Sequence, residues 1–364
     1  MGCLDHDVLV VGGGPAGAAT AITLARNGFR VVLAESKTNL SFKIGESLPP
    51  AATPLLRDLG VLETMTAGQH LPCPGNLAAW GSNELVAHDF IRDPHGFGWH
   101  LDRARFDADL RASAAAAGAE VRLNCQVQHW LFEEHAQLWH VALGQGDARH
   151  EIAARWMVDA TGRRAFVASA CGAKSTALSQ TIAHHALYPA RDEDLDHRTC
   201  IEATPCGWWY TALVPGRRRL IAFFSDADLT DNVTLRTPEG FKLHARQTNH
   251  ISTLLPEDAP ATVETCSAHS TTRDAFTGCG WLAVGDATFA FDPLSSQGLF
   301  HALYTGLRGG QAVADALNGD DRATAKYQKQ LRKIERHYQA HLTGYYSMEK
   351  RWPHEEFWSR RSEH

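Results

Sequence analysis

Three glycines near the start of the chain have the spacing of a nucleotide-binding turn. Gly12, Gly14 and Gly17 follow the run 7–11, which is apolar after Asp7, and form the pattern G-x-G-x-x-G. In such a turn the first glycine permits the tight bend, the second lets the backbone approach a pyrophosphate, and the third lets a helix pack closely on the strand. A helix over 18–26 would then direct its N-terminal amides at the phosphates, so the segment predicts a bound dinucleotide.

Acidic residues end three of the predicted strands. Glu35 closes the strand RVVLAE, where a carboxylate can accept hydrogen bonds from a ribose and would repel a 2′-phosphate. Asp159 ends the strand in WMVDATGR, and Asp286 follows the strand in WLAVGD. Ligands of open α/β sheets bind outside the carboxyl ends of the strands, so we expect these acids near the ligand. The glycine pattern by itself leaves FAD and NAD open.

A polar loop interrupts apolar sequence at residues 292–298, which read DPLSSQG. Pro293 ends the preceding strand, and the next helix is predicted to begin at the end of the loop. Backbone N–H groups would be supplied there by Ser295, Ser296, Gln297 and Gly298. The N-terminus of a helix stabilises negative charge, such as that of a reduced flavin. The alternative interpretation is an ordinary strand-to-helix turn.

The order of these motifs, GxGxxG, DATG and then GD followed by Pro and Gly, resembles the flavoprotein monooxygenase family of the aromatic-hydroxylase type, which includes flavin-dependent halogenases. The resemblance implies FAD as cofactor, with Asp286 on its ribityl chain and the 292–298 loop at the flavin ring. It implies O2 as co-substrate, and oxygen transfer to an electron-rich aromatic ring through a flavin C4a-hydroperoxide. The sequence contains no second G-x-G-x-x-G, so NAD(P)H that docks transiently or a separate flavin reductase would reduce the flavin.

Further site residues are assigned through this resemblance. The predicted FAD contacts are Gly12, Gly14, Pro15, Ala16, Gly17, Glu35, Ser36, Ser47, Arg103, Val127, Ala160, Gly162, Gly285, Asp286, Pro293, Gly298 and Leu299. The predicted catalytic residues are Pro293, Ser296, Gln297, Gly298, Glu46 and Trp208. Arg103 has the alternative role of a surface helix cap. The sequence shows no cluster of His and Cys with metal-ligand spacing, so no metal site is predicted.

The turn Gly45-Glu46-Ser47 is similar to that of the halogenase-like branch, but two features depart from halogenases. Thr53 and Pro54 stand where the resemblance implies a halogen-carrying lysine, and Arg57 cannot act as a nucleophilic amine because it stays protonated. The Trp-x-Trp segment of halogenases is replaced by adjacent Trp208 and Trp209. A halogenase of tryptophan, phenol or pyrrole substrates is therefore the alternative function. A flavin reductase of the geranylgeranyl-reductase type and a non-catalytic flavin-binding chaperone are further alternatives.

Within the family, the segments KIGESLPP, GWHLDRARFDA and GDATFAFDPLSSQGLFHAL are most similar to the small flavoprotein maturases of tryptophylquinone enzymes, of the LodB, GoxB and QhpG type. This resemblance implies a Trp side chain of a partner protein or peptide as the substrate. The charged C-terminal segment, with Trp352 and Trp358, is predicted either to pack on the FAD-binding part or to meet that partner.

The elements that must position these residues predict an α/β (α+β) chain. We expect a Rossmann-like FAD-binding fold of the GR2 type, with an inserted β-sheet substrate domain and C-terminal helices. The predicted units are an FAD-binding domain over 1–69, 101–174 and 271–318, a substrate domain over 70–100 and 175–270, and a helical segment over 319–364. Candidate pocket residues, each with the alternative of a place in the core, are His70, Trp80, His88, Trp99, His100, His184, Trp208, Trp209 and Tyr210.

Composition narrows the remaining choices. The formal charge is −6, from 35 basic and 41 acidic residues without a basic stripe, which argues against a nucleic-acid partner. The eight cysteines are scattered without C-x-x-C spacing, which indicates reduced thiols and a cytoplasmic protein. No apolar stretch approaches the roughly 20 residues of a membrane span, so no membrane partner is expected.

Overall fold

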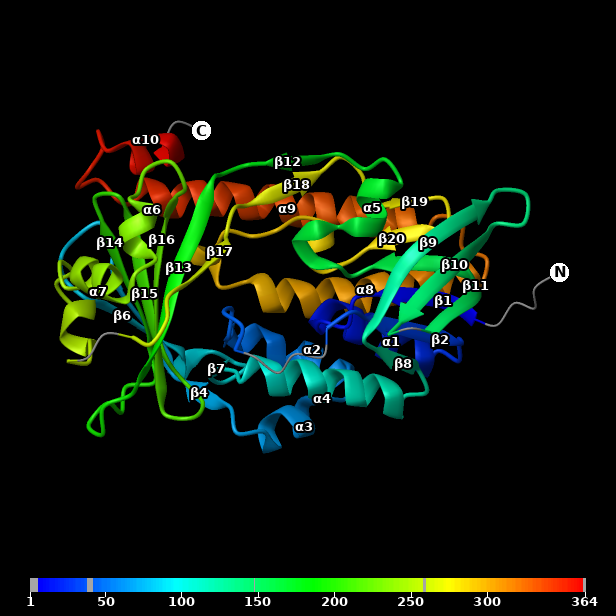
Figure 1. Ribbon diagram of the computed structural model, residues 1–364, viewed down its shortest axis with the longest axis horizontal. Coiled ribbons are helices and arrows are strands. Elements are labelled where there is room, and N and C mark those ends of the chain that lie inside the picture. The colour runs from blue at the N-terminus through cyan, green and yellow to red at the C-terminus, as the bar shows by residue number, and fades with distance from the viewer. Residues whose placement is uncertain (1–5, 38–41, 147, 258–259, 363–364) are drawn as a thin grey trace.

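The computed structural model describes residues 6–37, 42–146, 148–257 and 260–362. Cys3, predicted to be a reduced thiol, lies outside the described residues. The molecule is elongated, with one large sheet toward each end, and two long helices run between them along its length (Figure 1). The predicted α/β fold class is confirmed.

The sheet at the right of Figure 1 has a parallel centre that contains the strand before the glycine turn. Its order is β19-β20-β11-β1-β2-β8. The first part of β11 also pairs with β10, and β10 pairs with β9. The strands are β1 (His6–Val11), β2 (Val31–Glu35), β8 (Glu120–Leu123), β9 (Cys125–Glu133), β10 (Leu138–Gln145), β11 (Ala148–Asp159), β19 (Thr277–Gly278) and β20 (Trp281–Ala283). Both faces of β1 are covered: Val8 and Val10 point into one apolar cluster and Leu9 and Val11 into another. A continuous apolar run is the expected sequence of such a strand.

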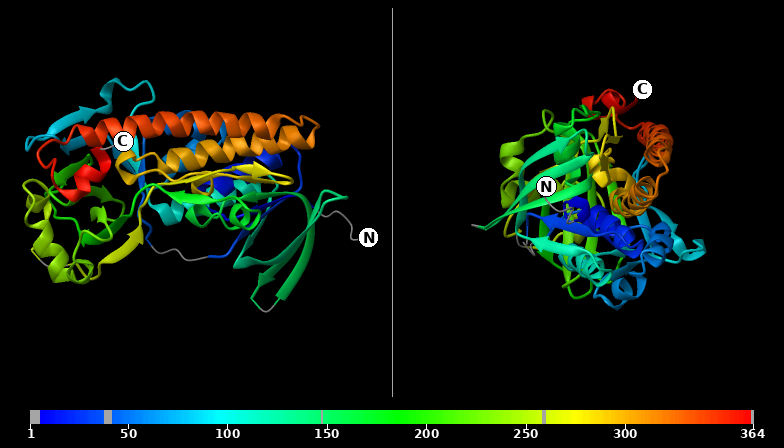
Figure 2. Two further views of the ribbon diagram at one scale, coloured as in Figure 1. Left: turned by 90° about the horizontal axis from the view of Figure 1, so that it is seen from above. Right: turned by 90° about the vertical axis from the view of Figure 1, so that its right-hand side faces the viewer.

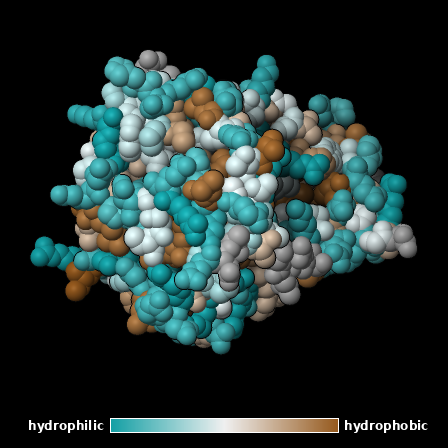
Figure 3. Space-filling model, turned by 60° about the vertical axis from the view of Figure 1, so that its left-hand side comes forward, coloured by the Kyte–Doolittle hydropathy of each residue, from teal (hydrophilic) through white to brown (hydrophobic). Residues whose placement is uncertain are grey.

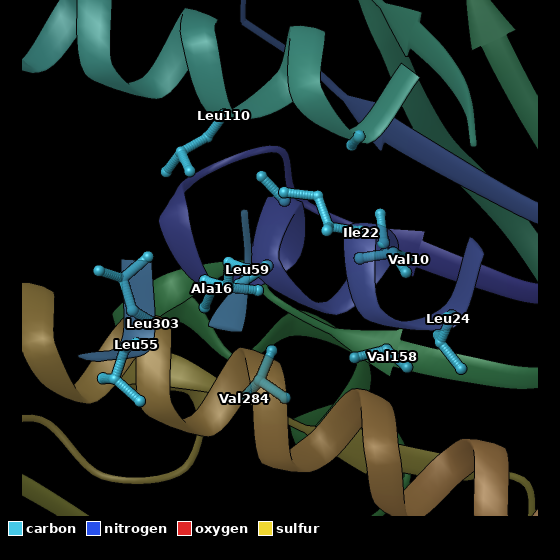
Figure 4. Close-up of a cluster of buried hydrophobic side chains, with 14 of the residues drawn as sticks. Val10, Ala16, Ile22, Leu24, Leu55, Leu59, Leu110, Val158, Val284 and Leu303 are labelled. Atoms are coloured by element: carbon cyan, nitrogen blue, oxygen red, sulfur yellow. The ribbon is translucent and has the colours of Figure 1, made fainter. Parts of the chain in front are cut away.

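Helix α1 (Pro15–Arg26) is the centre of the main apolar cluster and lies between α4 (Arg103–Ala116) and α8 (Gly298–Leu317) (Figure 4). Gly306 of α8 makes this close packing possible. A Cβ atom at position 306 would lie 2.3 Å from the carbonyl oxygen of Ala16. Small residues therefore bring α8, and with it the 292–298 loop, directly against the glycine turn.

The sheet at the left of Figure 1 has seven strands in the order β17-β13-β16-β15-β14-β5-β6. They are β5 (Gly75–Ala79), β6 (Val86–Asp89), β13 (Thr181–Pro189), β14 (Thr199–Thr204), β15 (Gly207–Val214), β16 (Arg218–Asp226) and β17 (Glu264–Ser267). Because β5 pairs with β14, the two stretches assigned to a substrate domain share one sheet. One face of the sheet carries Trp208 and the other packs Trp209 against α7 (Pro238–Ala245). The exact domain boundaries stay a prediction.

Shorter elements connect the two sheets. A three-stranded sheet consists of β3 (Ser47–Leu48), β7 (Gly98–His100) and β4 (Leu71–Cys73), and a two-stranded one of β12 (Ser175–Ala177) and β18 (Thr271–Arg273). The remaining short helices are α2 (Thr53–Asp58), α3 (Leu62–Ala67), α5 (Phe166–Ala170) and α6 (Asn232–Leu235).

The C-terminal segment packs along the whole molecule. Helix α9 (Ala323–Ser347) lies beside α8, and α10 (Glu356–Ser362) covers the left-hand sheet (Figure 2). The side chain of Trp358 is only 2% exposed and packs against Trp80 and Tyr346. The prediction that Trp358 offers surface to a partner is therefore wrong, because the apolar face of α10 is used inside the molecule.

The predicted start of one helix also differs from the structure. Helix α1 begins at Pro15 rather than residue 18, because Gly14 is its N-cap and proline suits the first helical turn. Helix α4 begins at Arg103, where the Asp102 carboxylate accepts a hydrogen bond from the Arg105 N–H. Strands β8 and β9 are separated by Asn124, whose φ of 53° lies in the left-handed region.

Two further properties hold for the described part of the chain. None of its helices has the length and apolar character that a membrane crossing requires. The seven described cysteines are free.

Candidate active site

A cavity of about 390 Å³ lies between the two large sheets. One face of the molecule is visibly hollowed, with apolar side chains at the border of the hollow (Figure 3). The predicted site residues that line the cavity are Gly14, Pro15, Ala16, Glu46, Ser47, Arg103, Ala160, Gly162, Trp208, Gly285, Asp286, Pro293, Ser296, Gln297, Gly298 and Leu299. Segments separated by nearly 300 residues are thus brought to one site.

The remaining predicted residues, which do not line the cavity, are Gly12, Gly17, Glu35, Ser36 and Val127. Gly12 has a φ of +108°, and a Cβ there would lie 2.4 Å from the carbonyl oxygen of Ala160. At Gly17 a Cβ would lie 1.9 Å from the carbonyl oxygen of Gly12. These two glycines shape the turn itself. Val127 packs against the apolar cluster around β10 and β11.

Glu35 holds the glycine turn from the end of β2. Its carboxylate accepts hydrogen bonds from the Gly13 N–H at 2.6 Å and from the Lys37 N–H at 2.7 Å. Ser36 follows it as an exposed residue of the bend. A ribose contact by Glu35 stays a prediction.

Asp159 does not reach the cavity, although it ends β11 as predicted. Its carboxylate accepts hydrogen bonds from the Thr161 N–H at 3.0 Å and from the Ala168 N–H at 2.8 Å. Burial raises the pKa of Asp159, and these hydrogen bonds offset part of that effect. The carboxylate is used to shape the turn into α5, while Ala160 and Gly162 of the same motif line the cavity.

Asp286 faces the cavity beside Arg163, which was not among the predicted site residues. The Arg163 Nε lies 3.6 Å from the Asp286 carboxylate, and Arg163 also donates to the carbonyl oxygen of His269. Enclosure by the protein raises the pKa of Asp286, while the charges of Arg163 and Arg103 lower it. The sequence feature that could have identified Arg163 is its position directly after the DATG motif.

Arg103 is a second guanidinium in the cavity wall. It donates to the Gly45 carbonyl oxygen at 2.8 Å and to the Asp107 carboxylate at 3.2 Å. Its side chain is only 13% exposed, so the alternative of a surface helix cap is wrong; Asp102 caps the helix instead.

The 292–298 loop forms a short 3-10 turn (Pro293–Ser295) before α8 begins at Gly298. Ser296 adopts a left-handed conformation with a φ of 50°, which is uncommon for a residue other than glycine. A Cβ at Gly298 would meet nothing within 4 Å, so this position opens on space beside the start of the helix. The first residues of α8 line the cavity, and their contact with a flavin stays a prediction.

Glu46 and Tyr210 form a buried pair in the cavity wall. The Tyr210 hydroxyl donates to the Glu46 carboxylate, which also accepts from the Gly45 N–H at 3.0 Å. Glu46 is 1% exposed, and burial raises its pKa above the ordinary value. Burial, together with the neighbouring Glu46, raises the pKa of Tyr210 as well. Burial therefore makes the ionised Glu46 carboxylate a stronger base than an exposed one.

An aromatic wall closes the side of the cavity formed by the left-hand sheet. Trp208 and Phe224 are opposite each other on β15 and β16, with ring centroids 4.0 Å apart and planes 13° apart. Both line the cavity. Phe224 was missed, although alternation along the neighbouring strands places it on the same face as Trp208.

Most other candidate pocket residues lie away from the cavity. Those that do not line it are His70, Trp80, His88, Trp99, His100, His184 and Trp209. Trp209 faces the opposite side of the sheet, as strand alternation requires. His100 is buried beside Thr199, at 3.0 Å, and burial lowers its pKa to about 4. Among the described residues no cluster of three potential metal ligands is found.

The cavity has the donor groups that FAD needs. Gly14 and Gly162 line it, and a Cβ at either would meet nothing within 4 Å, which leaves room for a ligand against the backbone. The N-termini of α1 and α8 open on it, and Arg103 and Arg163 add positive charge. These features fit a pyrophosphate at one helix and an electron-rich ring at the other.

Known enzymes are similar to this chain in sequence. The LodB protein of Marinomonas mediterranea, assigned as an FAD-dependent oxidoreductase, is 28% identical over 364 aligned residues, which cover 98% of this chain and 97% of LodB. The 1H-pyrrole-2-carbonyl-[peptidyl-carrier protein] brominase of Pseudoalteromonas luteoviolacea is 25% identical over 337 aligned residues, which cover 89% of this chain and 80% of the brominase.

Solved structures share the fold. The myxobacterial chondrochloren halogenase CndH superposes with a TM-score of 0.88 at 24% identity, over 98% of this chain and 85% of CndH. The peptidyl tryptophan dihydroxylase QhpG superposes with a TM-score of 0.80 at 23% identity, over 98% of this chain and 78% of QhpG. The resemblance to halogenase-like flavoproteins and to LodB- and QhpG-type proteins, expected from the sequence, is confirmed. The FAD binding domain family matches residues 5–337, so this chain belongs to that family of flavoproteins.

Proposed function

We propose that this chain is an FAD-dependent monooxygenase that hydroxylates an electron-rich aromatic ring, the indole of a Trp in a partner polypeptide. The observation that carries the proposal is the aromatic wall of Trp208 and Phe224, which lines the same cavity as the 292–298 loop. A planar substrate ring can pack there in an apolar environment. Of the relatives, QhpG acts on a peptidyl Trp and has the same fold.

In this proposal the chain binds the cofactor and keeps water away from the reaction. Bound FAD, once reduced, supplies the chemistry by which O2 oxidises the ring. Arg103, Arg163 and the N-terminus of α1 hold the phosphates, and the amides at the start of α8 face the flavin ring. The reductant is NAD(P)H or a separate flavin reductase.

Glu46 and Tyr210 are the residues placed to handle a proton. When an oxygen atom bonds to a ring carbon, that carbon must lose its hydrogen as a proton to restore aromaticity. A carboxylate with a raised pKa is a stronger base than an exposed one, and the Tyr210 hydroxyl fixes its orientation. Glu46 therefore accepts the proton of the reacting ring.

A partner polypeptide, rather than a free amino acid, fits the charges of the wall. Among the described residues, the two arginines that line the cavity already have partners: Arg103 binds Asp107 and Gly45, and Arg163 binds His269 and lies beside Asp286. Because this proposal also assigns both guanidinium groups to the cofactor phosphates, neither is left as a clamp for a free carboxylate. A Trp within a peptide carries no such charges.

Co-expression with the products of neighbouring genes, followed by intact-mass measurement, tests this function. We expect a gain of one or two oxygen atoms on one partner, and its loss in Asp286→Ala and Gly298→Val variants. Gly344→Ala, in the part of α9 where a Cβ meets nothing within 4 Å, is the matched control and should retain the gain. Efficient turnover of a small free aromatic, with no partner modified, would replace the partner by a small-molecule substrate. Absence of O2 consumption with reduced FAD would instead favour the reductase or chaperone alternatives.

Halogenation is the second candidate, because several relatives are halogenases or brominases. No lysine belongs to the described cavity lining, and Lys43 is paired with Asp107 on α4 at 3.0 Å. We therefore predict no halogenated product from tryptophan, reduced FAD, O2 and chloride or bromide. A product heavier by one halogen in mass spectrometry would overturn this prediction.

A further inference from the structure

Three tyrosines of α9 place their hydroxyl groups at the two ends of the segment that joins β20 to the 292–298 loop. Tyr327 donates to the Ala283 carbonyl oxygen at 2.9 Å. The Tyr338 hydroxyl accepts from the Asp292 N–H at 2.5 Å, and the Tyr346 hydroxyl donates to the Asp292 carboxylate at 3.1 Å. The two ends of the segment that carries Gly285 and Asp286 are thus attached to one helix.

Asp292 is the point from which the loop is held. It is 2% exposed, and its carboxylate also accepts from the Leu294 N–H at 2.9 Å, which caps the 3-10 turn. Four residues later Ser296 has an uncommon left-handed φ. Such a conformation persists only where the surrounding structure over-determines it. The hydrogen bonds of Tyr338 and Tyr346 with Asp292 hold the loop in this conformation from outside it.

The tyrosines are themselves fixed by packing that reaches the other end of the molecule. The Tyr338 ring lies 4.1 Å from that of Phe291 in an edge-on arrangement. Tyr346 is 3% exposed and packs against Trp358 of α10. The Arg361 guanidinium lies over the Tyr346 ring at 5.3 Å and pairs with Asp226 of the left-hand sheet at 2.5 Å. The position of Tyr346 therefore depends on α10 and on the left-hand sheet.

We propose that Tyr338 and Tyr346 are positioning residues, which hold Asp292 so that the amides at the start of α8 meet the flavin ring in a single geometry. The inference rests on the proposed function, since it assigns these amides to the flavin. Helix α9 then holds the loop in position, although neither tyrosine lines the cavity. Loss of either hydroxyl frees the loop without changing any group that touches the cofactor.

The test compares Tyr346→Phe and Tyr338→Phe with Tyr345→Phe, whose side chain is 60% exposed on the same helix. Apoprotein of each variant is titrated with FAD, amide hydrogen exchange is followed over residues 292–298, and the midpoint potential of the bound flavin is measured. We expect the dissociation constant of FAD to rise roughly three- to tenfold in the first two variants, as the loss of one buried hydrogen bond implies. Exchange in the loop should accelerate, and the potential should become more negative because reduced flavin loses its preferential contacts.

A merely structural role for the tyrosines would lower the unfolding temperature while leaving the potential and the loop exchange at the values of Tyr345→Phe, and that result would overturn the proposal. If Tyr346→Phe fails to fold, Tyr338→Phe decides by the same readouts. None of these measurements uses a substrate. The proposed hydroxylation can therefore fail while the positioning role holds, and the reverse outcome is equally visible.

Discussion

At the scale of single residues, Gly14 and Gly17 differ in what their missing side chains permit. A Cβ at Gly14 meets nothing within 4 Å and the residue has an ordinary φ of −73°, whereas a Cβ at Gly17 collides with the backbone of Gly12 at 1.9 Å. We predict that Gly14→Val folds normally but binds FAD at least about tenfold more weakly, because its methyl groups occupy the cavity. Gly17→Val should fail to fold stably.

Thermal melting and FAD titration of both variants check this contrast. Wild-type FAD affinity in Gly14→Val would contradict the placement of the cofactor at the glycine turn. A stable Gly17→Val would contradict the close contact between α1 and the turn.

The Glu46 carboxyl should make stability depend on pH. Burial raises the pKa of Glu46 above the value of the unfolded chain, and the hydrogen bonds from Tyr210 and Gly45 offset only part of this rise. The folded state therefore binds the proton more tightly, so the stabilisation is full at acidic pH and is lost as pH rises through the folded-state pKa. In Glu46→Gln, the free energy of unfolding should fall less than that of the wild type between about pH 4 and pH 8.

Urea unfolding at a series of pH values measures this difference, with Glu63→Gln on the exposed surface of α3 as control. The control should follow the wild-type curve. Parallel curves for Glu46→Gln and the wild type would show that Glu46 does not titrate in this range.

At the scale of elements, two helical glycines should respond oppositely to alanine. At Gly306 a Cβ would lie 2.3 Å from the Ala16 carbonyl oxygen, so Gly306→Ala forces α8 away from α1 and should destabilise the fold by about 1–3 kcal/mol. At Gly344 of α9 a Cβ meets nothing within 4 Å, so Gly344→Ala should stabilise by about 0.5–1 kcal/mol through helix propensity. Chemical denaturation measures both, and equal signs would contradict the packing of α1 on α8.

At the scale of the whole molecule, α10 ties the end of the chain to the left-hand sheet. Phe357 is 1% exposed, and the Arg361 guanidinium lies 3.7 Å from its ring centroid. We predict that Phe357→Ala lowers the free energy of unfolding by about 3–5 kcal/mol. Met348→Ala, at a side chain that is 57% exposed, should stay within about 0.5 kcal/mol of the wild type. If denaturant titrations gave equally small losses of unfolding free energy for both variants, α10 would not be part of the core.

Local sequence determined the cofactor-binding part of this protein. Strand β1, the glycine turn, the strand that ends at Asp159 and the loop before α8 were all predicted, because backbone conformation in tight turns and buried parallel strands depends on residue type at fixed short spacing. The resemblance of these motifs to a known family then supplied FAD, and the family match agrees.

Tertiary structure decided which side chains meet. Glu46 and Tyr210 are 164 residues apart, and only the register of β15 beside the turn 45–47 joins them. Asp159 ends a strand at the edge where ligands bind, and the fold turns its carboxylate inward to α5. Trp358 and Tyr346 look like surface of a charged helical tail, but become core once both sheets are in place. Contacts between distant segments depend on packing and strand register, which no short stretch of sequence contains.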